Sequence, residues 1–164
     1  MTVWDIRTLP IFTGLNTMQI YSIIGSFSLA QYRKGASICK FGDYDQDMFI
    51  VVKGCVKVLS GTGVILGYLN EKDIFGEIGF VYGISRNATV IAEEDSTIAI
   101  LDKWQFENVS QVDPAVKTVL YKNIMLNIVN KLNLANSMIE QITNENENTA
   151  GKPKTSNVEC ERSM

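Results

Sequence analysis

One stretch of the sequence, residues 73–90, combines residue types that suit a phosphorylated sugar. Gly76 precedes a short apolar run, and a glycine at the mouth of a helical turn lets backbone N–H groups approach an anion closely. Arg86 offers a planar fork of donors that matches the oxygens of a phosphate. Glu77 is poorly placed beside a phosphate alone, but its carboxylate can accept a hydrogen bond from a sugar hydroxyl. The residues by themselves therefore predict a compact sugar-phosphate pocket.

The composition excludes histidine-dependent chemistry. The chain has no histidine, so it can build neither a Ser-His-Asp nor a Cys-His arrangement, and no His-ligated metal. Its three cysteines, Cys39, Cys55 and Cys160, have no zinc or iron–sulfur spacing. We interpret Cys39 and Cys55 as small strand residues in a reducing compartment. We therefore expect no enzyme, no metal site and no cofactor.

The charge pattern argues against nucleic-acid and membrane partners. The net charge is −3 and no basic stripe is present, whereas nucleic-acid binding usually needs one. Residues 8–32 carry no formal charge, but Pro10, Gly14 and several amide and hydroxyl side chains make them too polar for a spanning helix. Asp5 and Arg7 interrupt any signal-peptide pattern. We therefore expect a soluble, cytoplasmic protein.

Short apolar runs from residue 32 to residue 101 predict the strands that hold this pocket. Gly and Asp turns separate the runs at intervals of about ten residues, which is typical of an antiparallel barrel or jelly roll. The runs are 37–40, 48–52, 55–59, 64–69, 88–92 and 97–101. The apolar stretch from Gly76 to Tyr82 breaks the pattern and is expected to form one short helix.

Helical segments are expected on both sides of the strands. Residues 1–31 are predicted to be helical, with a break at Pro10 and Gly14. Asp113 and Pro114 suit the cap and the first residue of a long helix. The predicted parts are an N-terminal helical segment (1–31), a β-roll (32–101), C-terminal helices (102–143) and a disordered, polar tail (144–164). The fold class is mainly β, with flanking helices.

The long helix carries an apolar seam with alternating steps of four and three residues. The seam consists of Tyr121, Met125, Ile128, Leu132, Ala135, Ile139 and Ile142. Such a seam can pack on its own domain. However, at about 1.5 Å per residue the helix extends further than the roll needs. We therefore expect residues 114–142 to form the contact of a homodimer.

The segment 73–90 resembles the phosphate-binding cassette of the cyclic-nucleotide-binding domain family, which is found in bacterial catabolite activator proteins and in regulatory subunits of cyclic-AMP-dependent protein kinase. The flanks are similar too, from Leu9-Pro10-Ile11-Phe12 through Gly42-Asp43 to the strand Ile65–Leu69. The resemblance covers roughly residues 5–142. It implies a β-roll (a double-stranded β-helix) with N-terminal helices and a long C-terminal helix.

The resemblance also implies residue roles. Arg86 would pair with the cyclic phosphate, and Glu77 would accept a hydrogen bond from the ribose 2′-hydroxyl. Backbone groups of the cassette would bind phosphate and ribose oxygens, and two leucines would line the base side. The candidate ligand-binding residues are Leu66, Leu69, Phe75, Gly76, Glu77, Ile78, Arg86, Asn87 and Ala88.

The sequence departs from the family pattern at three places. Lys72 replaces the usual turn glycine, which implies a different local turn. Asn87 lacks the hydroxyl that often accompanies cyclic GMP recognition, so cyclic AMP is favoured while the base stays open. No helix-turn-helix segment follows the long helix. We therefore expect a stand-alone sensor that signals to an unidentified effector protein through its C-terminal helix.

One other interpretation remains open. The β-roll could have lost its nucleotide and serve as an interaction or dimerisation module. Arg86 could then be a structural arginine, and Glu77 could simply interact with the helix dipole. A metal-dependent enzyme on a related roll is excluded, because it needs histidine ligands.

Overall fold

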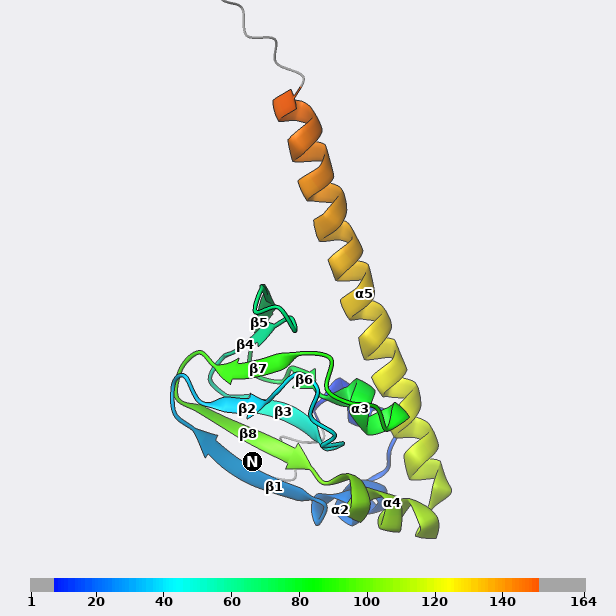
Figure 1. Cartoon of the computed structure of the whole chain (residues 1–164). Coiled ribbons are helices and arrows are strands. Elements are labelled where there is room, and N and C mark those ends of the chain that lie inside the picture. Colours follow the sequence, from blue (N-terminus) through cyan, green and yellow to red (C-terminus); the bar gives the residue numbers. More distant parts are fainter. Residues whose placement is uncertain (1–7, 151–164) are drawn as a thin grey trace, which may run out of the picture. The chain divides into compact units, whose positions relative to one another are not determined.

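Two antiparallel sheets of four strands each form the body of the protein (Figure 1). The computed structural model describes residues 8–150, with the backbone alone for residues 145–150. In the first sheet the order is β1 (Phe27–Tyr32), β8 (Ser96–Leu101), β3 (Met48–Lys53) and β6 (Ile74–Phe75). In the second it is β2 (Ser37–Cys39), β7 (Thr89–Ala92), β4 (Val56–Leu59) and β5 (Ile65–Leu69). The predicted β-roll class is confirmed.

The two sheets share one hydrophobic core. Its buried members come from six strands and are Cys39, Phe49, Val51, Val56, Phe75, Val90 and Ile98. The rings of Phe49 and Phe75 stack with their centroids 4.9 Å apart, and this stack lies directly before the cassette glycine. Burial of these side chains fixes β6 against β3, so the cassette starts from a rigid edge of the roll.

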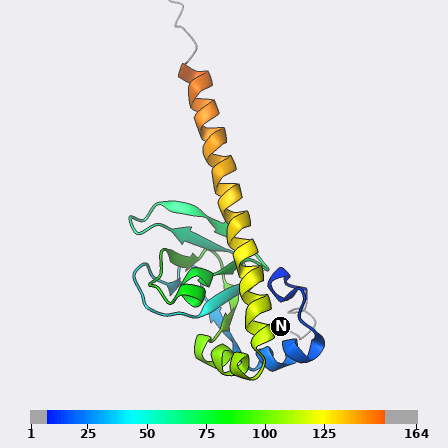
Figure 2. The same ribbon diagram turned by 90° about the vertical axis from the view of Figure 1, so that its right-hand side faces the viewer.

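Short helices lie at one end of the roll. They are a 3₁₀ turn η1 (Pro10–Phe12), α2 (Thr17–Ile24) and α4 (Lys103–Val112). Asn16 caps α2, because its side chain accepts a hydrogen bond from the N–H of Gln19. In two perpendicular views α2 and α4 lie side by side (Figure 1, Figure 2). The side chain of Gln19 also donates to Asp113 at 2.9 Å and so ties α2 to the chain just after α4.

The long helix α5 (Pro114–Ala150) begins as predicted. The Asp113 carboxylate accepts a hydrogen bond from the N–H of Ala115 at 3.0 Å. The first turns of α5 bury a face made of Val116, Leu120 and Ile124. This buried face lies beside the predicted seam, and of the seam residues Tyr121 also packs at the start of the helix, against Phe80 and Phe106.

The chain divides into two units, one ending at Met125 and the other beginning at Leu126. The described part of the second unit is the remainder of α5. Apart from Ile128, which is partly buried, its large apolar side chains are half exposed or more, and they include Leu126, Val129, Leu132, Leu134, Met138, Ile139 and Ile142.

The structure corrects the predicted boundaries at two places. The helical N-terminal segment was expected through residue 31, but α2 ends at Ile24 and residues 27–32 form β1, which pairs with β8. Residues 144–150 were expected to be disordered, but they continue α5. The rest of the predicted tail, residues 151–164, lies outside the described residues. The six predicted strand runs and the short helix after Gly76 are confirmed.

Candidate functional site

A left-handed glycine connects strand β6 to the short helix α3 (Glu77–Tyr82). Gly76 has a φ of +76°, a region that favours glycine. A Cβ atom at Gly76 would lie 2.6 Å from Nη1 of Arg86 and 2.9 Å from a ring carbon of Phe49. A glycine is therefore required at position 76 for two reasons. Only glycine readily adopts this turn, and a side chain there would occupy the space of the Arg86 guanidinium.

Arg86 is buried at this turn, with 4% of its surface exposed. Its Nη1 donates to the carbonyl oxygen of Gly76 at 3.0 Å, and its Nη2 donates to the carbonyl oxygen of Asp47 at 2.7 Å. Nη2 also donates to Oδ2 of Asp45 at 2.7 Å. The guanidinium carbon lies 5.0 Å from the centroid of the Phe49 ring. Carbonyls, a carboxylate and a ring face thus hold one buried cation.

One nitrogen of this guanidinium makes no hydrogen bond within the described part of the chain. The Nε atom of Arg86 is buried and has no hydrogen-bond partner among the described residues. Unpaired buried donors are rare, because each costs about 1–3 kcal/mol of desolvation. The arrangement can therefore accept one more acceptor group, such as an anion, at Arg86.

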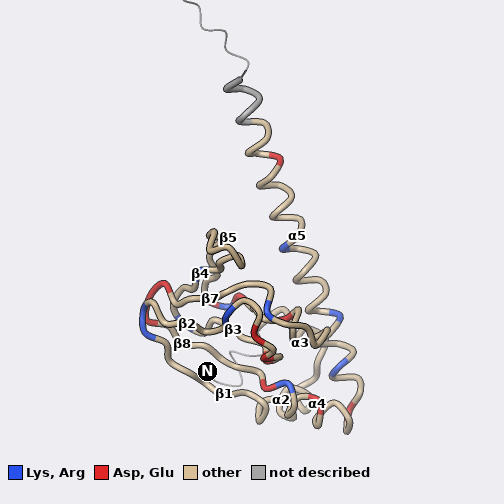
Figure 3. Tube along the Cα trace, viewed as in Figure 1, with Lys and Arg blue, Asp and Glu red and all other residues tan. Residues whose placement is uncertain are grey.

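The acidic loop before β3 is fastened to the end of the cassette. The N–H of Arg86 donates to the carbonyl of Asp43 at 2.7 Å, and the N–H of Gly42 donates to the carbonyl of Arg86 at 2.8 Å. Acidic positions of this loop lie next to α3 (Figure 3). A Cβ at Gly79 would come within 3.3 Å of Nη1 of Arg86, so this helix position also needs a small residue.

The other cassette candidates differ in exposure. Phe75 and Glu77 are buried, and Glu77 lies in the first turn of α3. Ile78 and Ala88 are half-buried, while Asn87 is exposed. The structure brings Gly76 and Arg86 into direct contact, as the spacing predicts.

The two leucines expected on the base side have different environments. Leu69 packs against the hydrophobic core. Leu66 is 61% exposed. In the pairing of β4 with β5, Val58 lies opposite Gly67 and Leu59 opposite Ile65, so Leu66 is the extra residue of a bulge. Of the two, only Leu66 offers a large free apolar surface.

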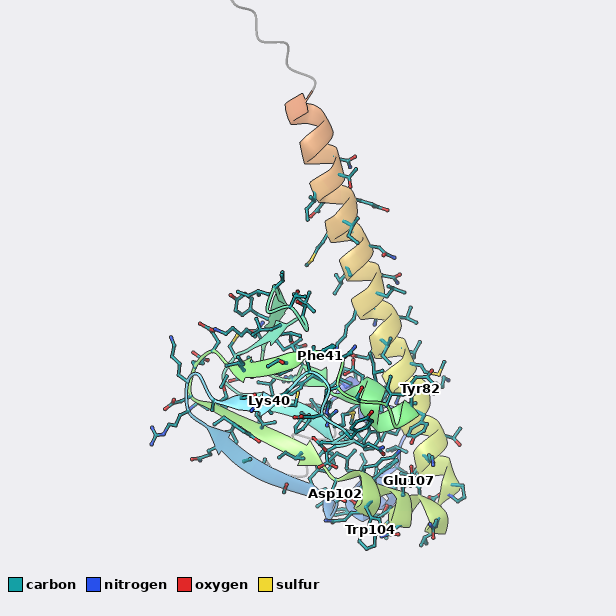
Figure 4. The ribbon with its side chains drawn as sticks, viewed as in Figure 1. Lys40, Phe41, Tyr82, Asp102, Trp104 and Glu107 are labelled. Carbon is teal, nitrogen blue, oxygen red and sulfur yellow. The ribbon has the colours of Figure 1, made fainter. Side chains whose placement is uncertain are left out.

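A polar cluster connects this site to the C-terminal helices. Oδ1 of Asp47 accepts a hydrogen bond from the N–H of Lys103, and burial raises the pKa of the Asp47 carboxyl. The Lys103 ammonium contacts Glu107 at 2.7 Å and the hydroxyl of Tyr121 at 2.6 Å, and Lys117 contacts Glu107 at 2.6 Å. Glu107 lies on α4, on the side of the first turn of α5 (Figure 4). We call Lys103, Glu107, Lys117 and Tyr121 the clasp.

The clasp carries both charge and aromatic contacts. Burial alone would raise the pKa of Glu107, but hydrogen bonds and charges from Lys103 and Lys117 outweigh it and lower the pKa to about 2. Lys103 Nζ also lies 4.5 Å from the ring centroid of Phe80, a fully buried residue of the cassette helix α3. The clasp therefore joins α3, α4 and the first turns of α5.

The sequence analysis missed the residues that surround Arg86. Asp45 and Asp47 accept its hydrogen bonds, Phe49 covers its face and Gly79 leaves it room. A signal was present in the sequence, because aspartates at alternating positions (43, 45 and 47) precede a strand that lies next to the cassette.

The described residues contain neither a candidate metal site nor a candidate membrane-spanning helix. Between residues 8 and 150, no group of three His, Cys, Asp or Glu side chains is placed to hold a metal ion. No described helix has both the length and the apolar composition of a membrane span. Cys39 and Cys55 are free thiols, and Cys160 lies outside the described residues.

Comparison with known proteins identifies the same domain family in a family profile and in individual relatives. The profile described as "Cyclic nucleotide-binding domain" matches residues 29–113. The cyclic nucleotide-gated channel beta-3 of Mus musculus is 30% identical over 122 residues, which cover 71% of this chain and 18% of the channel. The cAMP-dependent protein kinase regulatory subunit of Schizosaccharomyces pombe is 28% identical over 102 residues, covering 62% of this chain and 24% of that protein. The chain thus spans only a fraction of these relatives.

A solved structure shows the same architecture. The catabolite activator protein of Thermus thermophilus superposes with a TM-score of 0.66 at 22% identity, covering 82% of this chain and 63% of that one. At this identity the likeness concerns the fold.

Proposed function

Because the chain belongs to the family of cyclic nucleotide-binding domains, we propose that it binds a cyclic nucleoside monophosphate at residues 75–90 and acts as a regulatory sensor. The observation that carries this proposal is the buried guanidinium of Arg86. Its Nη1 donates to the carbonyl oxygen of Gly76, while its Nε has no hydrogen-bond partner among the described residues. A singly charged cyclic phosphate would give that donor an acceptor.

The family resemblance supports the remaining proposed contacts of the nucleotide. Glu77 would accept from the ribose 2′-hydroxyl, and the backbone of Gly76, Ile78 and Ala88 would bind phosphate and ribose oxygens. Leu66 would cover the base. We propose cyclic AMP as the preferred ligand over cyclic GMP, since Asn87 stands where a hydroxyl often accompanies guanine recognition.

Calorimetric titration of the wild-type protein tests the proposal. Cyclic AMP, cyclic GMP and a cyclic dinucleotide are compared under identical buffer conditions. We expect saturable one-to-one binding of cyclic AMP, weaker binding of cyclic GMP and none of the dinucleotide. Absence of binding for all three would refute the proposed function and favour a β-roll that serves as an interaction module.

The output of the sensor is proposed to run through α5. The domain family is regulatory, so we propose that the chain acts without catalysis. We also propose that it works in the cytoplasm as a homodimer and signals to an effector protein. The clasp supports this route, because it joins the cassette helix to the start of α5.

Hydrogen exchange with and without cyclic AMP tests the route. Protection should rise at residues 75–90 and also along residues 114–142, while the strands change little. Protection that rose at the cassette alone would show that α5 does not transmit the signal.

A further inference from the structure

The carboxylate of Asp45 stands where a ligand would be expected on Arg86. Its Oδ2 lies 2.7 Å from Nη2 of Arg86. The two partners are exposed to different degrees, since 3% of the arginine side chain and 44% of the aspartate side chain are accessible. A buried guanidinium is thus neutralised by a carboxylate that reaches it from the solvent side.

Counting donors shows what this contact excludes. Nη2 of an arginine carries two hydrogens, and here one is used by the carbonyl of Asp47 and the other by Asp45. Nη1 donates to the carbonyl of Gly76. A phosphate pairs best with two parallel donors on one edge of the guanidinium. Nε has no hydrogen-bond partner within residues 8–150, but both Nη2 hydrogens, one of which would complete such a fork, are already taken.

The contact that can open most easily is that of Asp45. The carbonyls of Gly76 and Asp47 belong to the backbone at β6 and at the start of β3, which pair with each other. Moving either would disturb the stacked core rings of Phe49 and Phe75. The Asp45 side chain is nearly half exposed and can be hydrated as soon as it leaves.

We propose that Asp45 is an internal substitute for the phosphate, and that a nucleotide binds by displacing it from Nη2 of Arg86. This rests on the proposed function. The carboxylate stabilises the empty site and lowers the affinity for the nucleotide, so it sets the ligand concentration at which the sensor responds.

The test compares full-length variants by calorimetry with cyclic AMP and by thermal unfolding without ligand. Asp45→Asn keeps the shape but replaces a charge-assisted contact by a neutral one, which is about half as strong. We expect it to bind cyclic AMP roughly tenfold more tightly and to unfold at a lower temperature when empty. Asp45→Ser serves as a second variant should the first fold poorly.

Asp43→Asn is the matched control, because it removes the same charge from the same loop but its carboxylate bonds to the N–H of Lys40 rather than to Arg86. It should bind within about twofold of wild type, since exposed charges act weakly at a distance. Tightening by Asp43→Asn equal to that of Asp45→Asn would overturn the proposal in favour of a general field effect.

Three further outcomes separate the inference from the function. If the wild type binds cyclic AMP and the Asp45 variants bind it equally or more weakly, the inference alone is overturned. Asp45 would then be a positioning residue for Arg86. Failure of wild type and of all variants to bind would refute the nucleotide function itself, and the inference with it. Binding by the Asp45 variants only would support the inference, while the wild type would fail the proposed function as a sensor.

Discussion

At the scale of single residues, the site depends on how a cation is accommodated inside a β-roll. A buried charge is tolerated only when it is paired and hydrogen-bonded. Arg86 satisfies this with two carbonyl oxygens and one carboxylate. Gly76 makes it possible, since any side chain there would occupy the space of Nη1.

Lys72 gives a prediction about stability. It stands where the family pattern has a turn glycine, and it adopts the left-handed conformation with a φ of +76°. Among the described residues it alone has a positive φ without being glycine. A β-carbon in this conformation destabilises the folded protein by roughly 1–2 kcal/mol, which a glycine would relieve. Glycine also gives the unfolded chain more conformational entropy, which offsets part of this relief. Lys72→Gly should therefore raise the free energy of unfolding by about 0.5–1 kcal/mol.

Urea unfolding measures this change. Lys72→Ala is the control, because it removes the charged side chain but keeps the β-carbon, and it should leave the stability close to that of wild type. A gain of equal size in both variants would locate the effect in the lysine side chain rather than in the backbone.

Part of this site could be predicted from the sequence. Gly76, Glu77 and Arg86 lie close together along the chain, so their spacing carries the information. Asp45 and Asp47 come from a loop some forty residues earlier, and their contact with Arg86 depends on the pairing of β3 with β6. Local patterns do not encode such a pairing, which explains why these residues were missed.

At the scale of elements, the clasp is the contact through which α3 and α5 meet. Phe80 of α3 packs edge-on against Tyr121 of α5 with their centroids 6.3 Å apart. Lys103 lies against both rings and bonds to Glu107. A shift of α3 on ligand binding would therefore change its contacts with α4 and with the start of α5.

Glu107 makes the clasp sensitive to acid. Its pKa in the folded protein is about 2, below the ordinary value of 4.5. Its contribution to stability is therefore complete above about pH 4.5 and is lost as the pH falls toward 2. Because solvent reaches the clasp, we expect Glu107→Gln to cost only about 1 kcal/mol at pH 7.

Unfolding by urea at pH 7 and pH 3 measures the difference. The gap between wild type and Glu107→Gln should be larger at pH 7 than at pH 3. Glu71→Gln, which changes an exposed carboxyl in a turn, controls for the loss of one charge. A gap that is the same at both pH values would mean that the charge of Glu107 contributes nothing.

The elements themselves were predictable to different degrees. Apolar runs with β-branched residues and flanking Gly or Asp turns were predicted as strands, because composition and turns within each run indicate a strand without knowledge of its partner. Strand β1 was missed because its sequence, Phe-Ser-Leu-Ala-Gln-Tyr, shows little apolar alternation and its pairing partner β8 is distant in sequence. The helix α5 passed its predicted end at residue 143 because no proline or glycine interrupts the chain before Gly151.

At the scale of the whole molecule, the exposed apolar row of α5 predicts self-association. Leu132 and Ile139 belong to the seam, and each is about 60% exposed (59% and 62%). We expect wild type to be a dimer by light scattering, and the double variant Leu132→Glu, Ile139→Glu to be a monomer, because charges at seam positions oppose burial. Asn130→Glu is the control, since it adds a charge outside the seam. A dimer that survives the double variant would place the interface elsewhere.

The most direct test of the central claim is calorimetric titration of Arg86 variants with cyclic AMP. Arg86→Ala removes the phosphate partner, and Arg86→Lys keeps the charge without the fork. We predict a loss of affinity of about ten- to a hundredfold for Arg86→Ala, and a loss nearly as large for Arg86→Lys, in proteins that retain the circular dichroism of wild type. Affinity unchanged in both folded variants would contradict the account, because the nucleotide would then be held by residues other than Arg86.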